Sequence, residues 1–181
     1  MVQHYFIGFK VPEREAKQLD EIRKTWNLQE THKVIPHVND LHVTLLYLGA
    51  MEDEVLQKLS VGLERIQDTV GSFHLTLTGV SSFGSPKNPR VLYVSIADEP
   101  KLKQLQKNIK TIGESLRLKL DQKPYVPHIT LAKKWIGNDD LNLNDMQIEP
   151  INIAINQFAI YSIHPQKTPS YQAVKTIELN I

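Results

Sequence analysis

The sequence predicts an α+β fold of two lobes related by a pseudo-twofold axis. Each lobe is expected to be an antiparallel sheet with helices outside, and a central cleft should lie between the lobes. Short runs rich in β-branched and aromatic residues alternate with runs whose apolar residues recur at helical spacing. The order of strand, helix and strand also occurs twice, at an offset of 86 residues. The 181 residues suit one domain, so we expect residues 1–181 to form a single domain of two intimately packed lobes.

The first repeat begins with a strand and a helix. Residues 5 to 10, YFIGFK, are rich in aromatic and β-branched residues and end at a Val-Pro step, which is typical of a short strand. From residue 13 to about residue 27, apolar residues recur at helical spacing, and the preceding proline suits a first helical turn. These residues are Ala16, Leu19, Ile22 and Trp26. A polar loop then leads to a strand over residues 41 to 48, LHVTLLYL.

The second repeat has the same order at the same spacing. VLYVSI, residues 91 to 96, aligns with YFIGFK, and residues 100 to 118 carry apolar residues along one helical face. The stretch VPHITLAKK, residues 126 to 134, contains His128 and Thr130, which follow His42 and Thr44 by 86 positions. A register shared by three elements indicates two related lobes.

The repeats diverge after the two His-x-Thr motifs. Residues 52 to 68 predict a full helix, whereas residues 137 to 146 allow only a short one. Strands over residues 73 to 83, 151 to 163 and 171 to 179 complete the predicted sheets. The Pro-containing polar stretches 84–89 and 164–169 predict turns or loops.

Each motif places one imidazole and one hydroxyl on the same face of a strand. Residues i and i+2 of a strand lie roughly 6.5 to 7 Å apart on one side, so His42 projects with Thr44 and His128 with Thr130. A single His-x-Thr in a strand is commonplace. Two at equivalent positions of apolar strands are not, because burying unpaired polar groups twice is costly. We therefore expect both pairs to face one cleft.

Two imidazoles and two hydroxyls suit a phosphodiester. A neutral imidazole can take a proton from an attacking water or hydroxyl while a protonated one gives a proton to the departing oxygen. The hydroxyls can donate hydrogen bonds to the non-bridging oxygens. The set suits a metal ion poorly, because neither motif has metal-ligand spacing and Asp40 is the one carboxylate nearby in sequence.

The composition excludes several classes of site. The chain has no cysteine, which rules out a disulfide framework, a thiolate metal site and a Cys nucleophile. The 21 basic and 20 acidic residues give a net charge of +1, so a local patch must hold any anionic partner. The sequence has neither a signal-peptide pattern at its start nor an apolar run of roughly 18 residues. We expect a cytoplasmic protein with no membrane partner, and a monomer.

Basic and aromatic residues near the motifs could bind a nucleic-acid end. Lys133 and Arg90 could contact phosphate, and Phe83 could stack on a base. Candidates of the same kinds, for which a solvated or core position is the ordinary alternative, are Lys87, Lys134, Tyr93 and Trp135. Surface or turn roles are expected for the other five histidines, of which His32 and His37 are best placed to approach the cleft.

At these residues the chain resembles a known family. HVTLLYLG and HITLAKKW resemble the paired signatures of the two-histidine (2H) phosphoesterase superfamily. Within it, the chain is similar to the RNA 2′,3′-cyclic phosphodiesterases, also named 2′-5′ RNA ligases. The similarity also covers YFIGFKVPE and FHLTLTGVSSFGSPKNPRVLYVSI, hence nearly the whole chain. Lys133 is a departure, since members often have Arg there, and Arg grips phosphate differently.

The resemblance implies a bilobal fold, an active-site quartet of His42, Thr44, His128 and Thr130, and a reaction without metal or cofactor. It implies hydrolysis of a 2′,3′-cyclic phosphate at an RNA 3′ end to a phosphomonoester, with reversible 2′-5′ ligation as a side activity. We assign His128 as the base that activates water and His42 as the acid. Three alternatives stay open: a cyclic phosphodiesterase acting on small nucleotides, a non-catalytic RNA-end-binding module, and a divalent-metal hydrolase.

Overall fold

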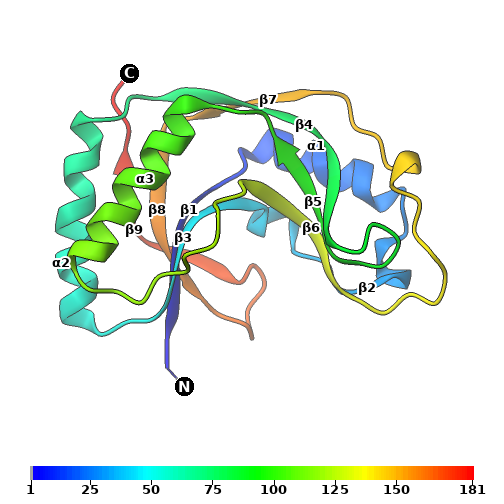
Figure 1. Ribbon diagram of the computed structural model, residues 1–181, viewed down its shortest axis with the longest axis horizontal. Helices are drawn as coiled ribbons and strands as arrows, with labels where there is room; N and C mark the ends of the chain where they lie inside the picture. Colours follow the sequence, from blue (N-terminus) through cyan, green and yellow to red (C-terminus); the bar gives the residue numbers. More distant parts are fainter. Residues whose placement is uncertain (1) are drawn as a thin grey trace.

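The computed structural model describes residues 2–181 and has the predicted α+β class (Figure 1). Within these residues, three α-helices accompany a nine-stranded sheet whose strand pairs are all antiparallel. The helices are α1 (Glu13–Lys24), α2 (Asp53–Glu64) and α3 (Pro100–Ser115). The strands are β1 (His4–Lys10), β2 (His32–Val34), β3 (His42–Ala50), β4 (Phe73–Gly84), β5 (Pro89–Ile96), β6 (His128–Trp135), β7 (Ile151–Ile155), β8 (Gln157–Ile163) and β9 (Tyr171–Glu178).

The two halves of the sheet meet at the motif strands. The strand order is β7-β4-β5-β6-β3-β1-β8-β9, with β2 paired to β6. β3 and β6 are joined through the pair Val43 and Ile129. The sequence predicted two antiparallel sheets, one for each lobe, and this junction joins them into one sheet. Strand patterns reveal which residues are extended but not which strand ends meet, so the junction could not be predicted.

The chain between residues 137 and 163 differs from prediction. The expected single strand over residues 151 to 163 is two strands that break at Asn156, and they serve opposite halves: β7 pairs with β4, and β8 pairs with β1. The expected short helix over residues 137 to 146 is only a 3₁₀ turn, Leu143–Asp145.

A short strand, β2, also forms within the polar loop that was predicted before residue 41. Its three residues are too few for a periodic pattern to show.

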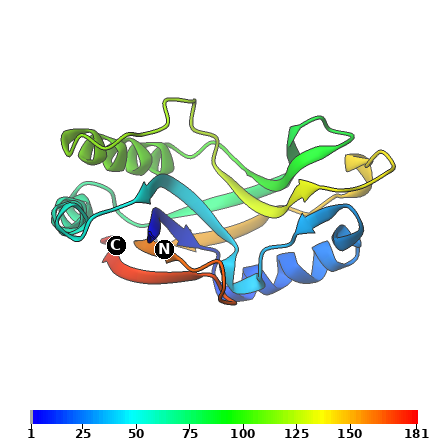
Figure 2. The same ribbon diagram turned by 90° about the horizontal axis from the view of Figure 1, so that it is seen from below.

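Each long helix of one repeat packs behind the motif strand of the other. In Figure 2, α1 and α3 lie on opposite sides of the molecule. Arg23 of α1 donates from Nη1 to the Leu131 carbonyl of β6 (3.1 Å), and Gln106 of α3 donates from Nε2 to the Leu45 carbonyl of β3 (3.3 Å). Leu131 follows Leu45 by 86 positions, so the two carbonyls occupy equivalent places. Arg23 is only 4% exposed and forms an ion pair with Asp20. The spacing of apolar residues in α1 did not predict that this arginine is buried.

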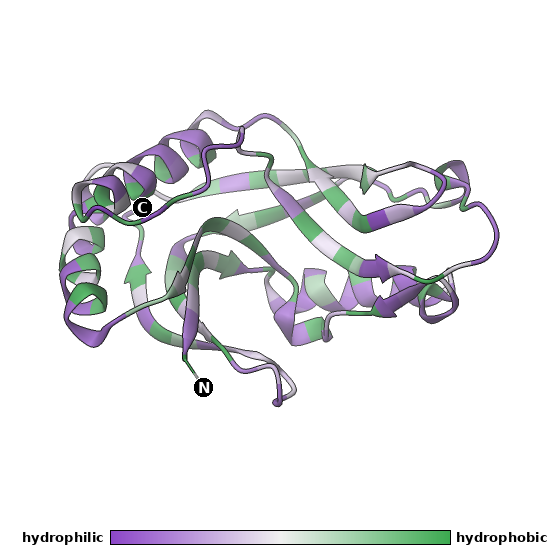
Figure 3. Ribbon diagram, turned by 60° about the horizontal axis from the view of Figure 1, so that its bottom comes forward, coloured by the Kyte–Doolittle hydropathy of each residue, from purple (hydrophilic) through white to green (hydrophobic). Residues whose placement is uncertain are grey.

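One hydrophobic cluster runs through both halves and includes residues of all three helices, such as Leu19, Leu59 and Leu105. Apolar and hydrophilic bands alternate along several strands in Figure 3, as expected where one face is buried. The duplication of one lobe within a single domain stays a prediction. None of the helices in residues 2–181 has the length and apolar character to cross a membrane.

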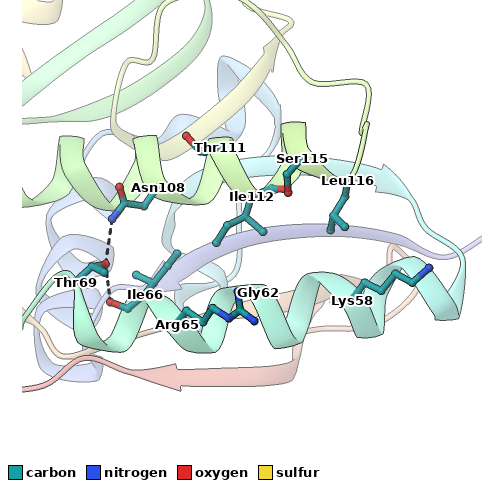
Figure 4. Close-up of a pocket in the computed structure, with 10 residues that line it drawn as sticks. All are labelled: Lys58, Gly62, Arg65, Ile66, Thr69, Asn108, Thr111, Ile112, Ser115 and Leu116. Atoms are coloured by element: carbon teal, nitrogen blue, oxygen red, sulfur yellow. Dashed lines mark hydrogen bonds between the residues drawn. The ribbon is translucent and has the colours of Figure 1, made fainter.

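The α2 and α3 helices approach closely at Gly62, where a Cβ atom would lie 2.9 Å from Ile112 Cγ2. Beside this contact is a hollow of about 400 Å³ (Figure 4). Ile66 and Leu116 are among the residues that line it, and Asn108 donates to the Thr69 hydroxyl. It contains none of the motif residues.

Gly8 should be essential for the register of β1 on β3. A Cβ atom there would lie 2.3 Å from the Val43 carbonyl oxygen, a backbone atom that cannot rotate away. We expect Gly8→Ala to lower the free energy of unfolding by about 1–3 kcal/mol, the usual cost of overpacking. The matched control is Gly79→Ala in β4, where nothing lies within 4 Å of the added atom. Urea unfolding that gives equal stabilities for the two variants would contradict this view of the β1·β3 contact.

His32 is a structural residue, contrary to the surface or turn role expected for it. It is 1% exposed, its Nε2 contacts the Pro89 carbonyl at 2.9 Å, and its ring lies against Trp135. Burial lowers its pKa, against the opposing effect of that carbonyl. Below about pH 6.5 the unfolded chain therefore binds a proton that the folded chain excludes, and stability falls as the pH falls.

We expect His32→Asn to lose less stability between pH 7 and 5 than the wild type, because that titrating group is gone. The control is His74→Asn, at an exposed site. Urea unfolding at each pH measures the difference. A pH dependence reduced as much in the control as in His32→Asn would count against the burial argument.

Candidate active site

The junction of the two motif strands brings the four motif residues together. Val43 is paired with Ile129, and the strands are antiparallel, so His42 lies across from Thr130 and Thr44 lies across from His128. Val43 and Ile129 are both fully buried. Successive side chains of a strand point to opposite faces, so the two His-x-Thr pairs share the other face.

Backbone carbonyls orient both imidazoles in the same way. His42 Nδ1 is 2.7 Å from the Asp40 carbonyl oxygen, and His128 Nδ1 is 2.7 Å from the Val126 carbonyl oxygen. A carbonyl can only accept, so each Nδ1 carries the hydrogen and each Nε2 is the nitrogen that gains or loses a proton. His42 Nε2 also lies 3.0 Å from the Thr44 hydroxyl oxygen. Both histidines therefore present the same titrating atom.

Aromatic rings enclose each imidazole. Phe6 and Tyr171 lie against His42, with ring centroids 4.8 and 4.9 Å away. Phe83 and Tyr93 lie against His128, at 4.9 and 5.3 Å. The predicted base-stacking residue Phe83 thus contacts an imidazole of the quartet, edge to face. Such rings exclude water from the imidazoles and hold them in place.

This burial lowers the pKa of both histidines. For His42, desolvation is the largest cause and brings the pKa to about 4, although its bond to the Asp40 carbonyl opposes the shift. The nearby charges of His128 and Lys133 lower it further. Burial also lowers the pKa of His128, against the effect of its bond to Val126. Two protonated imidazoles would repel each other, so His42 and His128 together hold at most one extra proton near neutral pH.

A β-bulge follows each motif and redirects the next side chains. In β3, Gly8 pairs with Thr44 and Ile7 with Leu46, so Leu45 is the extra residue. In β6, Tyr93 pairs with Thr130 and Leu92 with Ala132, so the extra residue is Leu131. The bulges occupy equivalent positions, 86 residues apart.

The bulges bring Tyr47 and Lys133 into the site. Simple alternation from the motif would direct Leu46 and Ala132 there instead. Tyr47 and Lys133 line a cavity of about 320 Å³ together with three residues of the quartet. The lining residues are Phe6, Pro36, His42, Thr44, Tyr47, Thr130, Lys133, Ile163 and Tyr171. Lys133 was predicted. Tyr47 was missed, although it precedes Lys133 by 86 positions.

Other predicted residues lie elsewhere. Arg90 is exposed on β5 and does not line this cavity. His37 is exposed and caps a 3₁₀ turn, where its Nδ1 accepts from the Asn39 amide (3.1 Å). Trp135 lies against the buried His32 rather than against the quartet. Among the missed residues, Phe6 and Tyr171 had no sequence signal, since both reach His42 from strands distant in the chain.

Asp40 is buried, 3% exposed, and its carboxylate is already engaged. It accepts from the Ser170 amide (2.7 Å) and the Tyr171 amide (3.1 Å), and Lys10 Nζ is 3.9 Å away. Within residues 2–181, no three His, Asp or Glu side chains are grouped closely enough to hold a metal ion. Asp40 therefore acts as a brace that fixes Tyr171 against His42.

This chain is similar in sequence and in fold to known proteins. The RNA 2′,3′-cyclic phosphodiesterase of Bacillus subtilis (strain 168) is 28% identical over 98% of this chain and 97% of its own length. That of Thermotoga maritima is 25% identical over 87% of this chain and 84% of its own length. The crystal structure of E. coli LigT complexed with 3′-AMP matches the fold with a TM-score of 0.79 and 22% identity, covering 100% of both chains.

A family model described as the 2′-5′ RNA ligase superfamily matches residues 11–162, which include both motif strands and most of the sheet. The match covers more than half of the chain and the whole quartet. The chain therefore belongs to the 2′-5′ RNA ligase superfamily.

Proposed function

We propose that this protein hydrolyses the 2′,3′-cyclic phosphate at an RNA 3′ end to a phosphomonoester by acid–base catalysis between His42 and His128, without a metal ion or cofactor. The observation that carries the proposal is the pair of imidazoles on one face, each with Nδ1 bound to a carbonyl and each with a lowered pKa. A pair that holds one proton has one group ready to accept and one ready to donate. Relatives named RNA 2′,3′-cyclic phosphodiesterase support the substrate class.

The two histidines differ in burial, and this supports separate roles. In the free protein, burial lowers the pKa of both histidines, to about 4 at His42. A bound phosphate anion favours the protonated imidazole, and its effect is largest where water screens least, which is at His42. His42 then gains the proton and donates it to the departing ribose oxygen. His128 stays neutral and takes a proton from the attacking water.

Neighbouring groups can stabilise the charge on the phosphate. The Thr44 and Thr130 hydroxyls can donate to the non-bridging oxygens, and the Lys133 ammonium adds a positive charge at the same cavity. Donors already in place need no reorganisation when charge develops. The flexible point charge of Lys133 lacks the fixed two-pronged geometry of Arg, so we expect it to contribute charge more than orientation.

The same groups could catalyse 2′-5′ ligation. If an RNA 5′-hydroxyl replaces water, the base removes its proton, the 5′-oxygen bonds to phosphorus, and the P–O3′ bond breaks as the acid protonates O3′. The product is a 2′-5′ phosphodiester and no energy source is consumed, so the step is reversible. Water is far more abundant than RNA ends, and hydrolysis should therefore dominate.

Removal of either histidine should lower turnover strongly. With a short RNA ending in a 2′,3′-cyclic phosphate and chelator present, we expect His42→Ala and His128→Ala each to lower kcat about 10²- to 10⁴-fold, the usual contribution of one positioned proton transfer. The product is followed as a phosphomonoester, and His74→Ala at an exposed strand position is the control. Loss of wild-type turnover in chelator would instead support a metal hydrolase. Tight binding without turnover would support an RNA-end-binding module.

The pH dependence should report both histidines. We expect a bell-shaped kcat/KM profile centred below pH 6.5, because burial lowers both pKa values in the free protein. The bell for kcat should lie at higher pH, because bound phosphate raises both values. Substrate binding should accordingly strengthen as the pH falls toward 5 and should take up protons. Initial rates and calorimetry in buffers of different ionisation enthalpy measure these effects. A flat rate from about pH 5 to 9 would exclude paired histidine catalysis.

A further inference from the structure

A second cavity, of about 390 Å³, adjoins the candidate active site. Tyr47 and Ile163 line both cavities, so they form the partition between them. The other residues that line it come from the N-terminal segment and from the loop between β8 and β9: Val2, Gln3, His4, His164, Pro165, Gln166 and Lys167. A molecule that occupies the catalytic cavity can therefore continue into this one past these two side chains.

Hydrogen bonds hold the partition in place. Tyr47 is 54% exposed, yet its hydroxyl lies 2.8 Å from His4 Nδ1. Gln3 Nε2 donates to the Ile163 carbonyl (2.7 Å) and so fastens the N-terminal segment to β8. An exposed aromatic ring anchored at its hydroxyl is a rigid stacking surface.

The loop that forms the far wall is also ordered. The His164 amide donates to the Ser170 carbonyl (2.7 Å), and the Lys167 amide donates to the His164 carbonyl (2.9 Å). The Ser170 amide in turn donates to Asp40, whose own carbonyl orients His42. The wall of the second cavity is thereby braced to the residue that positions a catalytic imidazole.

The chemistry of the second cavity suits a nucleotide. Tyr47 offers a ring face, and Val2, Ile163 and Pro165 add apolar surface. His4 Nδ1 is bonded to Tyr47 and His164 Nε2 to Ser162, so the other ring nitrogens, His4 Nε2 and His164 Nδ1, and the Gln166 amide offer hydrogen-bond partners for the edge of a base. No Asp or Glu lines the cavity, and Lys167 is exposed and forms no ion pair within residues 2–181, so its charge is available to a phosphate.

We propose that this cavity binds the nucleotide that precedes the 3′-terminal nucleotide of the RNA. Its base stacks on Tyr47, and the phosphate that joins it to the terminal nucleotide meets Lys167. This inference rests on the proposed function and makes an RNA chain, rather than a mononucleotide, the preferred substrate. Arg90 lies outside the catalytic cavity, so we place the chain on the Lys167 side.

The test compares two substrates with the same terminal base: a mononucleoside 2′,3′-cyclic phosphate and a dinucleotide ending in that cyclic phosphate. Stacking of one base typically contributes about 1–3 kcal/mol, so we expect kcat/KM for the dinucleotide to be about 10-fold higher or more. A dinucleotide whose first residue is abasic should lose most of this advantage. It keeps the linking phosphate and so separates stacking from charge.

Substitutions in the second cavity test whether it is the source of the higher kcat/KM for the dinucleotide. His164→Ala and Lys167→Gln should lower kcat/KM for the dinucleotide about 3- to 10-fold and leave the mononucleotide rate unchanged, because each removes one contact with the first nucleotide. His164→Ala also removes the bond to Ser162, whose hydroxyl keeps its bond to the Gln172 carbonyl. Lys167→Gln should also reduce the slope of log kcat/KM against log salt by about one for the dinucleotide. The matched control is Lys58→Gln, an exposed lysine on α2. Arg90→Gln tests the opposite exit from the cleft.

Each outcome bears on a different claim. No hydrolysis of either substrate by the wild type overturns the proposed function. Equal hydrolysis of both substrates, with no effect of the loop variants, overturns the second cavity as a subsite and leaves the proposed function standing. A dinucleotide advantage that is lost in Arg90→Gln but kept in Lys167→Gln also overturns it, because the chain would then leave the site on the Arg90 side.

Discussion

The candidate active site depends on one backbone contact, the pairing of Val43 with Ile129 between β3 and β6. The two motif strands come from opposite repeats and are bridged at that pair. Its antiparallel geometry places each histidine across from the threonine of the other motif. A shift of one residue in this register would turn one His-x-Thr pair into the core and its apolar neighbours into the cleft. The buried side chains of Val43 and Ile129 make such a shift costly.

The packing around this junction explains how the register is kept. Gly8 lets β1 approach β3 more closely than any side chain would permit. Behind the strands, Arg23 and Gln106 reach the carbonyls of Leu131 and Leu45, the extra residues of the two bulges. A bulge disrupts the ladder of hydrogen bonds, and buried carbonyls without partners are costly. The helices of opposite repeats therefore stabilise the distortions that direct Tyr47 and Lys133 into the cavity.

The two halves of the site are alike in backbone and different in environment. Both imidazoles bond to the carbonyl two residues earlier, and both are enclosed by two aromatic rings. On one side the residue that supplies the carbonyl is Asp40, which also braces the start of β9. On the other side it is Val126, which is exposed and has no carboxylate. Similar backbones thereby give two histidines of unequal burial, and unequal burial shifts the pKa values of two like groups apart.

The sequence by itself determined the fold class and most strand and helix positions, and it predicted that His42, Thr44, His128 and Thr130 would face one cleft. Those features rest on local periodicity and on a repeat that can be counted along the chain. Only the tertiary structure decided the single joined sheet, the division of residues 151 to 163 between two halves, and the entry of Phe6, Tyr47 and Tyr171 into the site. It also placed Arg90 outside the cavity and buried His32. Strand partners, bulges and burial arise from contacts between distant segments, and such contacts leave no periodic signal in the chain.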